Sequence, residues 1–184
     1  MRKILLPIAI SLSIIGSGSA LADKKDLTVV EEEGRVKITW QSPQDYRDIR
    51  PSNQTRKSFR NQIFNEFDET FEKLAEELPE GQLLEVTVTD VDLAGQVWPG
   101  SFVGVGHGAD DIRVIKRIHI PRLEFSFNLK DADGNVLKTG EVKIKDMNFL
   151  DRLSVRFRER PFPYEKRMIR EWFNDTFTEE VAKL

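Results

Sequence analysis

Hydrophobic and polar residues alternate in three stretches of the chain, and such alternation predicts β-strands that bury one face. The apolar positions are Val36, Ile38 and Trp40, then Leu84, Val86 and Val88, and then Leu123, Phe125, Phe127 and Leu129. Residues 131–135 have the composition of a hairpin turn, so residues 136–146 are predicted to pair with the third of these strands. Residues 112–120 are also predicted to be extended, and residues 27–30 could add an edge strand.

Two longer stretches place hydrophobic residues every three or four positions, which is the spacing of an amphipathic helix. The first helix is predicted to follow the cap residue Asn53 and to stop at residues 79–81, with apolar positions Phe59, Ile63, Phe67, Phe71, Leu74 and Leu78. The second is predicted to begin near Pro161 and Pro163, with apolar positions Met168, Ile169, Trp172, Phe173 and Phe177.

The predicted order is therefore β-α-β-β-β-α. This order is most simply an α+β fold, a two-layer sandwich in which a mostly antiparallel sheet of about four strands carries both amphipathic helices on one face. Residues 23–184 have the size of one domain, large enough to bury roughly 70% of the surface that the unfolded chain exposes.

The first 22 residues have the features of an N-terminal signal peptide for export. Arg2 and Lys3 give a positive start, residues 4–15 are mostly apolar, and Ala20 and Ala22 supply the small residues of a cleavage site. Because the apolar run is shorter than the roughly 18 residues of a membrane-spanning helix, we expect cleavage rather than a retained anchor. The mature domain, residues 23–184, is then expected in the periplasm, with secretion as the alternative.

The composition narrows the classes of function. The chain contains no cysteine, which excludes thiol catalysis, thiolate metal sites and a lipid-modified N-terminal cysteine. Its net charge of −3 becomes −5 once Arg2 and Lys3 leave with the signal, and this balance does not favour a nucleic-acid-binding protein. No transmembrane segment is predicted in the mature chain, which is expected to be soluble.

Basic residues crowd the start of the first predicted helix: Arg47, Arg50, Arg56, Lys57 and Arg60. Acidic residues crowd its end, so the charge order opposes the helix dipole at a cost of about 0.3–1 kcal/mol per exposed charge. Stability does not explain this order, whereas a helix N-terminus surrounded by cations is a candidate site for an anion such as a phosphorylated lipid head or an acidic glycan. The alternative is that these cations pair with the abundant acids and only keep the surface soluble. A second basic cluster consists of Arg152, Arg156, Arg158 and Arg160.

A second candidate chemistry involves Asp90, Asp92, His107, Asp110 and Asp111. The first two lie two residues apart, so on a strand both carboxylates would project from the same face, while the other three follow in a glycine-rich loop. Together they could bind a divalent cation, and Asp90, Asp92 and His107 are the candidates for acid–base catalysis. Structural roles in turns are the alternative, because the spacing matches no known metal motif.

His119 has apolar neighbours in the extended segment. We predict that it is a surface-facing strand residue and leave it out of this site.

Several short runs resemble a known family and together cover most of the mature chain. They are Trp40, Pro43, Tyr46 and Asp48, the runs 89–95 and 111–114, Pro121-Arg122-Leu123, and the run 145–150. With them the chain is similar to bacterial exported proteins grouped as domain of unknown function 3016. The resemblance implies an envelope protein, and because the family has no assigned activity it supplies no catalytic residues.

These observations predict a soluble periplasmic protein without catalysis, an envelope accessory or binding protein for an anionic ligand or a protein partner. No cofactor and no nucleic-acid partner are expected. One alternative is a metal-assisted hydrolase that uses the Asp and His residues above, where the cation would polarise a scissile bond or activate water. The other alternative is a subunit of a larger envelope complex, which would co-purify with another protein.

The signal predicts that the exported protein begins at Asp23. N-terminal sequencing of the protein recovered from the periplasmic fraction measures this directly. A retained N-terminal segment in the membrane fraction would show that residues 4–15 act as an anchor instead.

Overall fold

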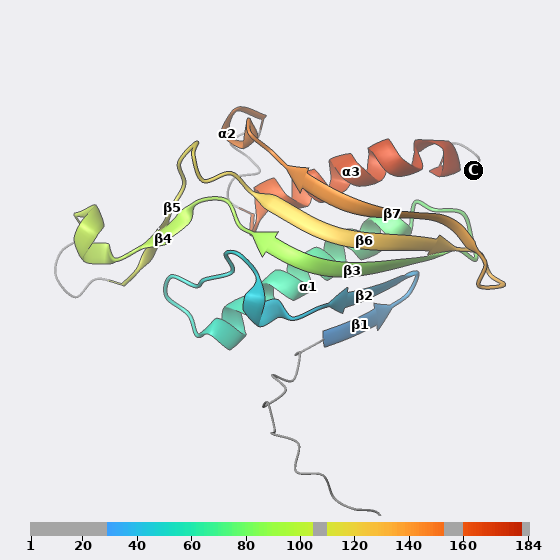
Figure 1. The fold of residues 1–184 in the computed structure, drawn as a ribbon, viewed down its shortest axis with the longest axis horizontal. Coiled ribbons are helices and arrows are strands. Elements are labelled where there is room, and N and C mark those ends of the chain that lie inside the picture. The colour runs from blue at the N-terminus through green and yellow to red at the C-terminus, as the bar shows by residue number, and fades with distance from the viewer. Residues whose placement is uncertain (1–28, 105–109, 153–159, 182–184) are drawn as a thin grey trace, which may run out of the picture.

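The computed structural model describes residues 29–104, 110–152 and 160–181 (Figure 1), so the predicted signal peptide lies outside the described residues. In chain order the strands are β1 (Val29–Glu33), β2 (Val36–Trp40), β3 (Leu83–Asp92), β4 (Gln96–Trp98), β5 (Ile112–Val114), β6 (Arg122–Lys130) and β7 (Val136–Lys145). The α-helices are α1 (Arg56–Ala75), α2 (Phe149–Arg152) and α3 (Pro163–Val181), and two short 3-10 helices are η1 (Pro43–Asp45) and η2 (Gly100–Val103).

The main sheet has five strands in the order β1-β2-β3-β6-β7, and every neighbouring pair is antiparallel except β2 and β3. Its register aligns the apolar positions of the predicted strands, since Ile38 lies opposite Val86 and Val86 lies opposite Phe127. The predicted α+β fold with a mostly antiparallel sheet is therefore confirmed. The fifth strand is β1, the edge strand that the sequence only suggested.

The parallel pair β2 and β3 requires a crossover, and α1 makes it. Figure 1 shows α1 and α3 on the same side of the sheet. The two helices run in the same direction, because successive contacts advance along both: Glu66 pairs with Lys166, and Phe71 meets Trp172 further on. Within the described ranges, no helix combines the length and the apolar character that crossing a membrane requires.

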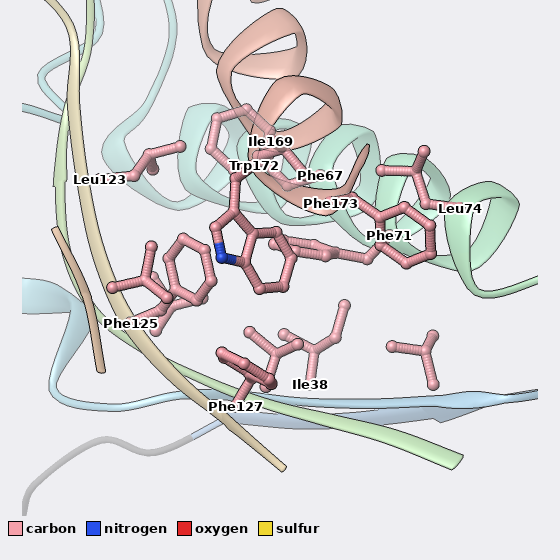
Figure 2. Packing of buried hydrophobic residues seen from close by; sticks show 14 of the residues in the cluster. Ile38, Phe67, Phe71, Leu74, Leu123, Phe125, Phe127, Ile169, Trp172 and Phe173 are labelled. Carbon is pink, nitrogen blue, oxygen red and sulfur yellow. The ribbon is translucent and has the colours of Figure 1, made fainter. Parts of the chain in front are cut away.

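Trp172 of α3 forms the centre of the aromatic core (Figure 2). Its ring centroid lies 4.7 Å from that of Phe125 and 5.3 Å from that of Phe127, both on β6, and 6.2 Å from that of Phe71 on α1. All three pairs are edge-to-face, a geometry that adds about 0.5–1.5 kcal/mol per pair beyond burial. The predicted helix stripes and strand faces thus meet in one core.

The segment 112–120 differs from its prediction as one extended strand. Only Ile112–Val114 form a strand, β5, which pairs with β4 in a separate two-stranded ribbon that projects from the body in Figure 1. The chain then turns, and the His119 N–H donates to the carbonyl of Lys116 at 3.0 Å. His119 is therefore a half-buried turn residue, and its prediction as a surface-facing strand residue is wrong.

Gly95 is the physical reason for this turn. Its φ angle is +85°, and its N–H donates to the carbonyl of His119 at 3.0 Å. A Cβ atom at this position would lie 2.6 Å from Ile115 Cδ1 and 2.8 Å from the Val114 carbonyl oxygen. The chain can fold back this closely only because residue 95 has no side chain.

The pairing of β6 with β7 yields a stability prediction at Gly140, which lies opposite Phe127. A Cβ atom at Gly140 would lie 2.9 Å from Phe127 Cε1, and that ring is held by Trp172 and Phe177. We expect Gly140→Ala to lower the free energy of unfolding by about 1–2 kcal/mol, measured by denaturant titration of residues 23–184. The neighbouring exposed change Glu141→Ala is the control, expected within about 0.5 kcal/mol of wild type. Equal stability of the two variants would contradict the close packing.

Candidate functional site

The connection between β2 and α1 runs along the C-terminal end of β3. The Gln41 N–H donates to the Val88 carbonyl at 3.0 Å, the chain then loops outward through η1, and the Asp48 N–H donates to the Val91 carbonyl at 3.1 Å. The Leu93 N–H returns a bond to the Asp48 carbonyl at 3.1 Å. Because β2 and β3 are parallel, both end at this edge of the sheet, and α1 must begin beside it.

Tyr46 anchors this loop. The side chain is buried, and its hydroxyl donates to the Val88 carbonyl at 2.9 Å. Burial, and secondly the charge of Asp90, raise the pKa of Tyr46 far above its ordinary value, so the phenol stays protonated and keeps this bond. Arg47 and Arg50, which follow Tyr46 in the chain, are therefore on a loop that is held in place by the core.

Asp90 and Asp92 project from the same face of β3, as predicted. An irregularity between Val88 and Asp90 shifts the alternation by one residue, so Val91 stays buried and both carboxylates lie on the face away from the helices. Asp90 accepts the Arg47 N–H at 2.7 Å and pairs with the Arg47 guanidinium at 3.1 Å. Asp92 accepts from Arg122 Nη1 at 2.5 Å. Each aspartate is thus neutralised by its own arginine.

Arg113 of β5 is a hub that no sequence pattern identified. Its guanidinium binds both carboxylate oxygens of Asp48, at 2.9 and 3.3 Å, and donates to the Arg50 carbonyl at 2.7 Å. Both side chains are largely buried, with 17% and 20% exposure. Arg50 in turn pairs with Asp111 at 2.9 Å. These bonds fasten the β4–β5 ribbon to the loop before α1.

Glu165 of α3 contacts the turn after β3 from the helix layer. It is fully enclosed at the start of α3, and its Oε1 accepts the Ala94 N–H at 2.7 Å. Loss of solvent raises its pKa, while the bonds from the N–H groups of Ala94 and of Glu165 itself act in the opposite direction. The turn that leads from β3 into the ribbon is therefore fixed to the helix layer.

The predicted metal-binding residues are not brought together as a group. Asp90, Asp92 and Asp111 each pair with an arginine, Asp110 is exposed, and His107 lies outside the described residues. Among the residues that the structure describes, no three His, Cys, Asp or Glu side chains are placed to hold a metal ion. Asp90, Asp92 and Asp111 instead form ion pairs that orient arginine side chains.

The predicted anion-binding residues do converge. Arg47, Arg50, Arg56 and Arg60 line one pocket of about 260 Å³, which we call the helix-start pocket. Tyr46 and Asp48 also contribute to its wall. Lys57 is exposed and does not line the pocket. Four of the five candidates, taken from two separate segments, thus face a common space.

Two of these four arginines are not neutralised. Arg56 and Arg60 form no ion pair with any residue that the structure describes, and Arg60 Nε is buried without a hydrogen-bond partner. They lie four residues apart at the positive end of α1, which carries Thr55 as its cap and no acid in its first turn. Like charges at this spacing repel by about 0.2–0.5 kcal/mol, and each also opposes the helix dipole. A bound anion would remove both penalties.

Comparison with known proteins identifies a family but no function. The family model described as "Protein of unknown function (DUF3016)" matches residues 34–175, most of the chain. No curated protein and no solved structure gives a significant match. The match spans the loop before α1, the ribbon, all of α1, and α3 as far as residue 175, so the arrangement described above lies within the matched residues.

The Arg113 hub can be tested by substitution. Arg113→Met leaves Asp48 without its partner, and we expect a loss of about 2 kcal/mol in the free energy of unfolding, because bonds to charged groups contribute about 1.5–3 kcal/mol. Hydrogen exchange in β4 and β5 should become faster, which mass spectrometry can measure. Arg117→Met is the matched control, since the Arg117–Asp151 pair is exposed on both sides and its loss should have no measurable effect. If Arg113→Met and Arg117→Met lose the same free energy of unfolding, Arg113 does not fasten the ribbon as described.

Proposed function

Since the chain belongs to the DUF3016 family of proteins of unknown function, we propose its role from its own geometry: it is a non-catalytic periplasmic protein that binds an anionic ligand in the helix-start pocket. One observation carries this proposal. Four cations predicted from sequence line one pocket, and two of them have no acidic partner among the described residues. Export rests on the signal-like residues 1–22.

The size of the pocket limits what it holds. About 260 Å³ is below the roughly 300–1,000 Å³ of most small-molecule sites, so it suits one anionic group rather than a whole ligand. Guanidinium groups bind phosphate and carboxylate through paired N–H donors, and the first N–H groups of α1 add partial positive charge. We propose that one phosphate or carboxylate group of an envelope molecule enters the pocket while the rest of the molecule stays outside.

Arg47 and Arg50 have a different role from Arg56 and Arg60. The first two are held by Asp90 and Asp111, so they are oriented but largely neutralised. The second two supply the net positive charge. This division means that binding requires little rearrangement, because the loop that carries the oriented pair is already fixed by Tyr46 and Arg113.

The test measures the melting temperature of residues 23–184 against inorganic phosphate at constant ionic strength. At a hundred times its dissociation constant, phosphate adds about 2.7 kcal/mol, which raises the melting temperature by roughly 5–10 °C. The double variant Arg56→Gln/Arg60→Gln should lose most of this rise. It should be no less stable than wild type without phosphate, since two charges leave the positive end of a helix.

Lys57→Gln is the matched control. It removes a cation from the same turn of α1, but Lys57 does not line the pocket, so the phosphate effect should persist. If phosphate stabilises neither wild type nor control, or if Lys57→Gln abolishes the effect as completely as the double variant, the pocket is not the site.

A role in protein association is a second candidate, favoured by the β4–β5 ribbon. Phe102 and Ile118 are 78% and 77% exposed, unusual for large apolar side chains. Phe102 lies in η2 after β4, and Ile118 lies in the turn after β5. Both therefore flank the ribbon, which Arg113 fastens to the loop before α1. This role predicts a co-purifying protein, and no stabilisation by phosphate is required.

A further inference from the structure

A larger basic cavity lies between α1 and α3, which we call the interhelical groove. Its volume is about 490 Å³, within the usual range of small-molecule sites. Six cationic side chains line it: Lys73, Arg152, Arg160, Lys166, Arg167 and Arg170. The only acids in its described lining are Glu69 and Glu77, so six positive charges face two negative ones. It shares no lining residue with the helix-start pocket.

The helix arrangement explains why these cations converge. On α3, residues 166, 167 and 170 follow one another at the spacing of a single helix face, and on α1 residues 70, 73 and 77 do the same. The parallel packing of the helices turns these faces toward each other. Arg152 and Arg160 belong to the second basic cluster of the sequence, whose other members, Arg156 and Arg158, lie outside the described residues.

Acids outside the groove hold several of the cations in place. Lys166 pairs with Glu66, Arg167 pairs with the buried Asp146, and Arg152 pairs with Glu171 at 2.8 Å. None of these three acids lines the cavity. These three cations are therefore oriented and largely neutralised from behind, whereas Arg170 forms no ion pair with any described residue.

Arg167 gives a second, independent indication of a ligand. Its side chain is only 12% exposed, and one terminal nitrogen binds Asp146. Its other terminal nitrogen, Nη1, is buried without a hydrogen-bond partner among the described residues, and its Nε, also without a hydrogen bond there, lies 3.7 Å from Glu171 Oε1. Buried donors normally have acceptors, so oxygen atoms of a bound anion would complete the set.

We propose that the interhelical groove binds a compact anion that carries two or more phosphate groups. The groups that need acceptors lie on separate residues, Arg167 Nη1 and the unpaired guanidinium of Arg170, and each phosphate ester brings about 1.5–2 negative charges and several acceptor oxygens. Arginine forks suit such tetrahedral oxyanions. Thr70, Leu74 and Pro163 complete the wall and leave room for a small organic part.

The required chemistry can come from inorganic polyphosphate or from an organic molecule with two phosphates. Isothermal titration calorimetry of residues 23–184 with tripolyphosphate and with fructose 1,6-bisphosphate, at 0.15 M ionic strength, distinguishes these sources. Binding of either probe supports the site. Failure of both to bind at millimolar concentration overturns it.

The double variant Lys73→Gln/Arg170→Gln locates the binding. Arg170 has no ion pair within the described residues, and Lys73 pairs only with the exposed Glu69, so the fold should be kept. We expect the dissociation constant to rise at least tenfold. The control Lys57→Gln/Lys145→Gln removes the same charge from exposed positions that line neither pocket and should change it less than twofold. Equal weakening by both variants would show general attraction to the surface and overturn the proposal.

These outcomes are independent of the proposed function. Loss of the phosphate effect on melting in Arg56→Gln/Arg60→Gln, with tripolyphosphate binding unchanged, would support both sites separately. Tripolyphosphate binding with unchanged dissociation constant and unchanged stoichiometry in Lys73→Gln/Arg170→Gln would reject the groove whatever the helix-start pocket does.

Discussion

The parallel pairing of β2 with β3 is the constraint on which the rest of the molecule depends. Two adjacent parallel strands must be joined by a crossover, so α1 has to begin at the end of the sheet where both strands finish. The loop that leads into α1 then lies against the last residues of β3, and its main chain bonds to Val91 and Leu93. The parallel pairing of β2 with β3 therefore places the charged residues 47–50 beside the charged residues 90–92, although the two segments are distant in sequence.

The ion pairs at this edge of the sheet determine which charged side chains are left to bind a ligand. Asp90, Asp92 and Asp111 bind Arg47, Arg122 and Arg50, so carboxylates that looked like a metal site in the sequence act as supports for arginines. Asp48 does the same for Arg113. A carboxylate already bound to a guanidinium is a weaker candidate for cation binding, because the arginine would first have to leave. The same pairing leaves Arg56 and Arg60 as arginines of the helix-start pocket that form no ion pair with a described residue.

Local patterns predicted the elements that depend on periodic burial, namely the long strands, both long helices and their layer. They failed where a contact distant in sequence decides the structure. The turn at His119 depends on Gly95, and the ribbon depends on Arg113 reaching Asp48, a partner in the first third of the chain. The cluster around α1 was visible as a composition bias, but which arginines would be neutralised was not. The groove could not be predicted from the sequence because its cations come from α1, α2, α3 and residue 160 between α2 and α3.

Helix α1 carries both proposed sites, and its length keeps them separate. Arg60 and Lys73 lie roughly 20 Å apart along the helix axis at 1.5 Å per residue. The Debye length is about 8 Å at physiological ionic strength, so an anion at one site is largely screened from the other. Coupling between the sites would then have to pass through movement of α1, which is packed on the sheet and on α3 through Phe67, Phe71 and Trp172. A rigid helix with separated basic surfaces is suited to two ligands, or two parts of one long ligand, without cooperativity between them.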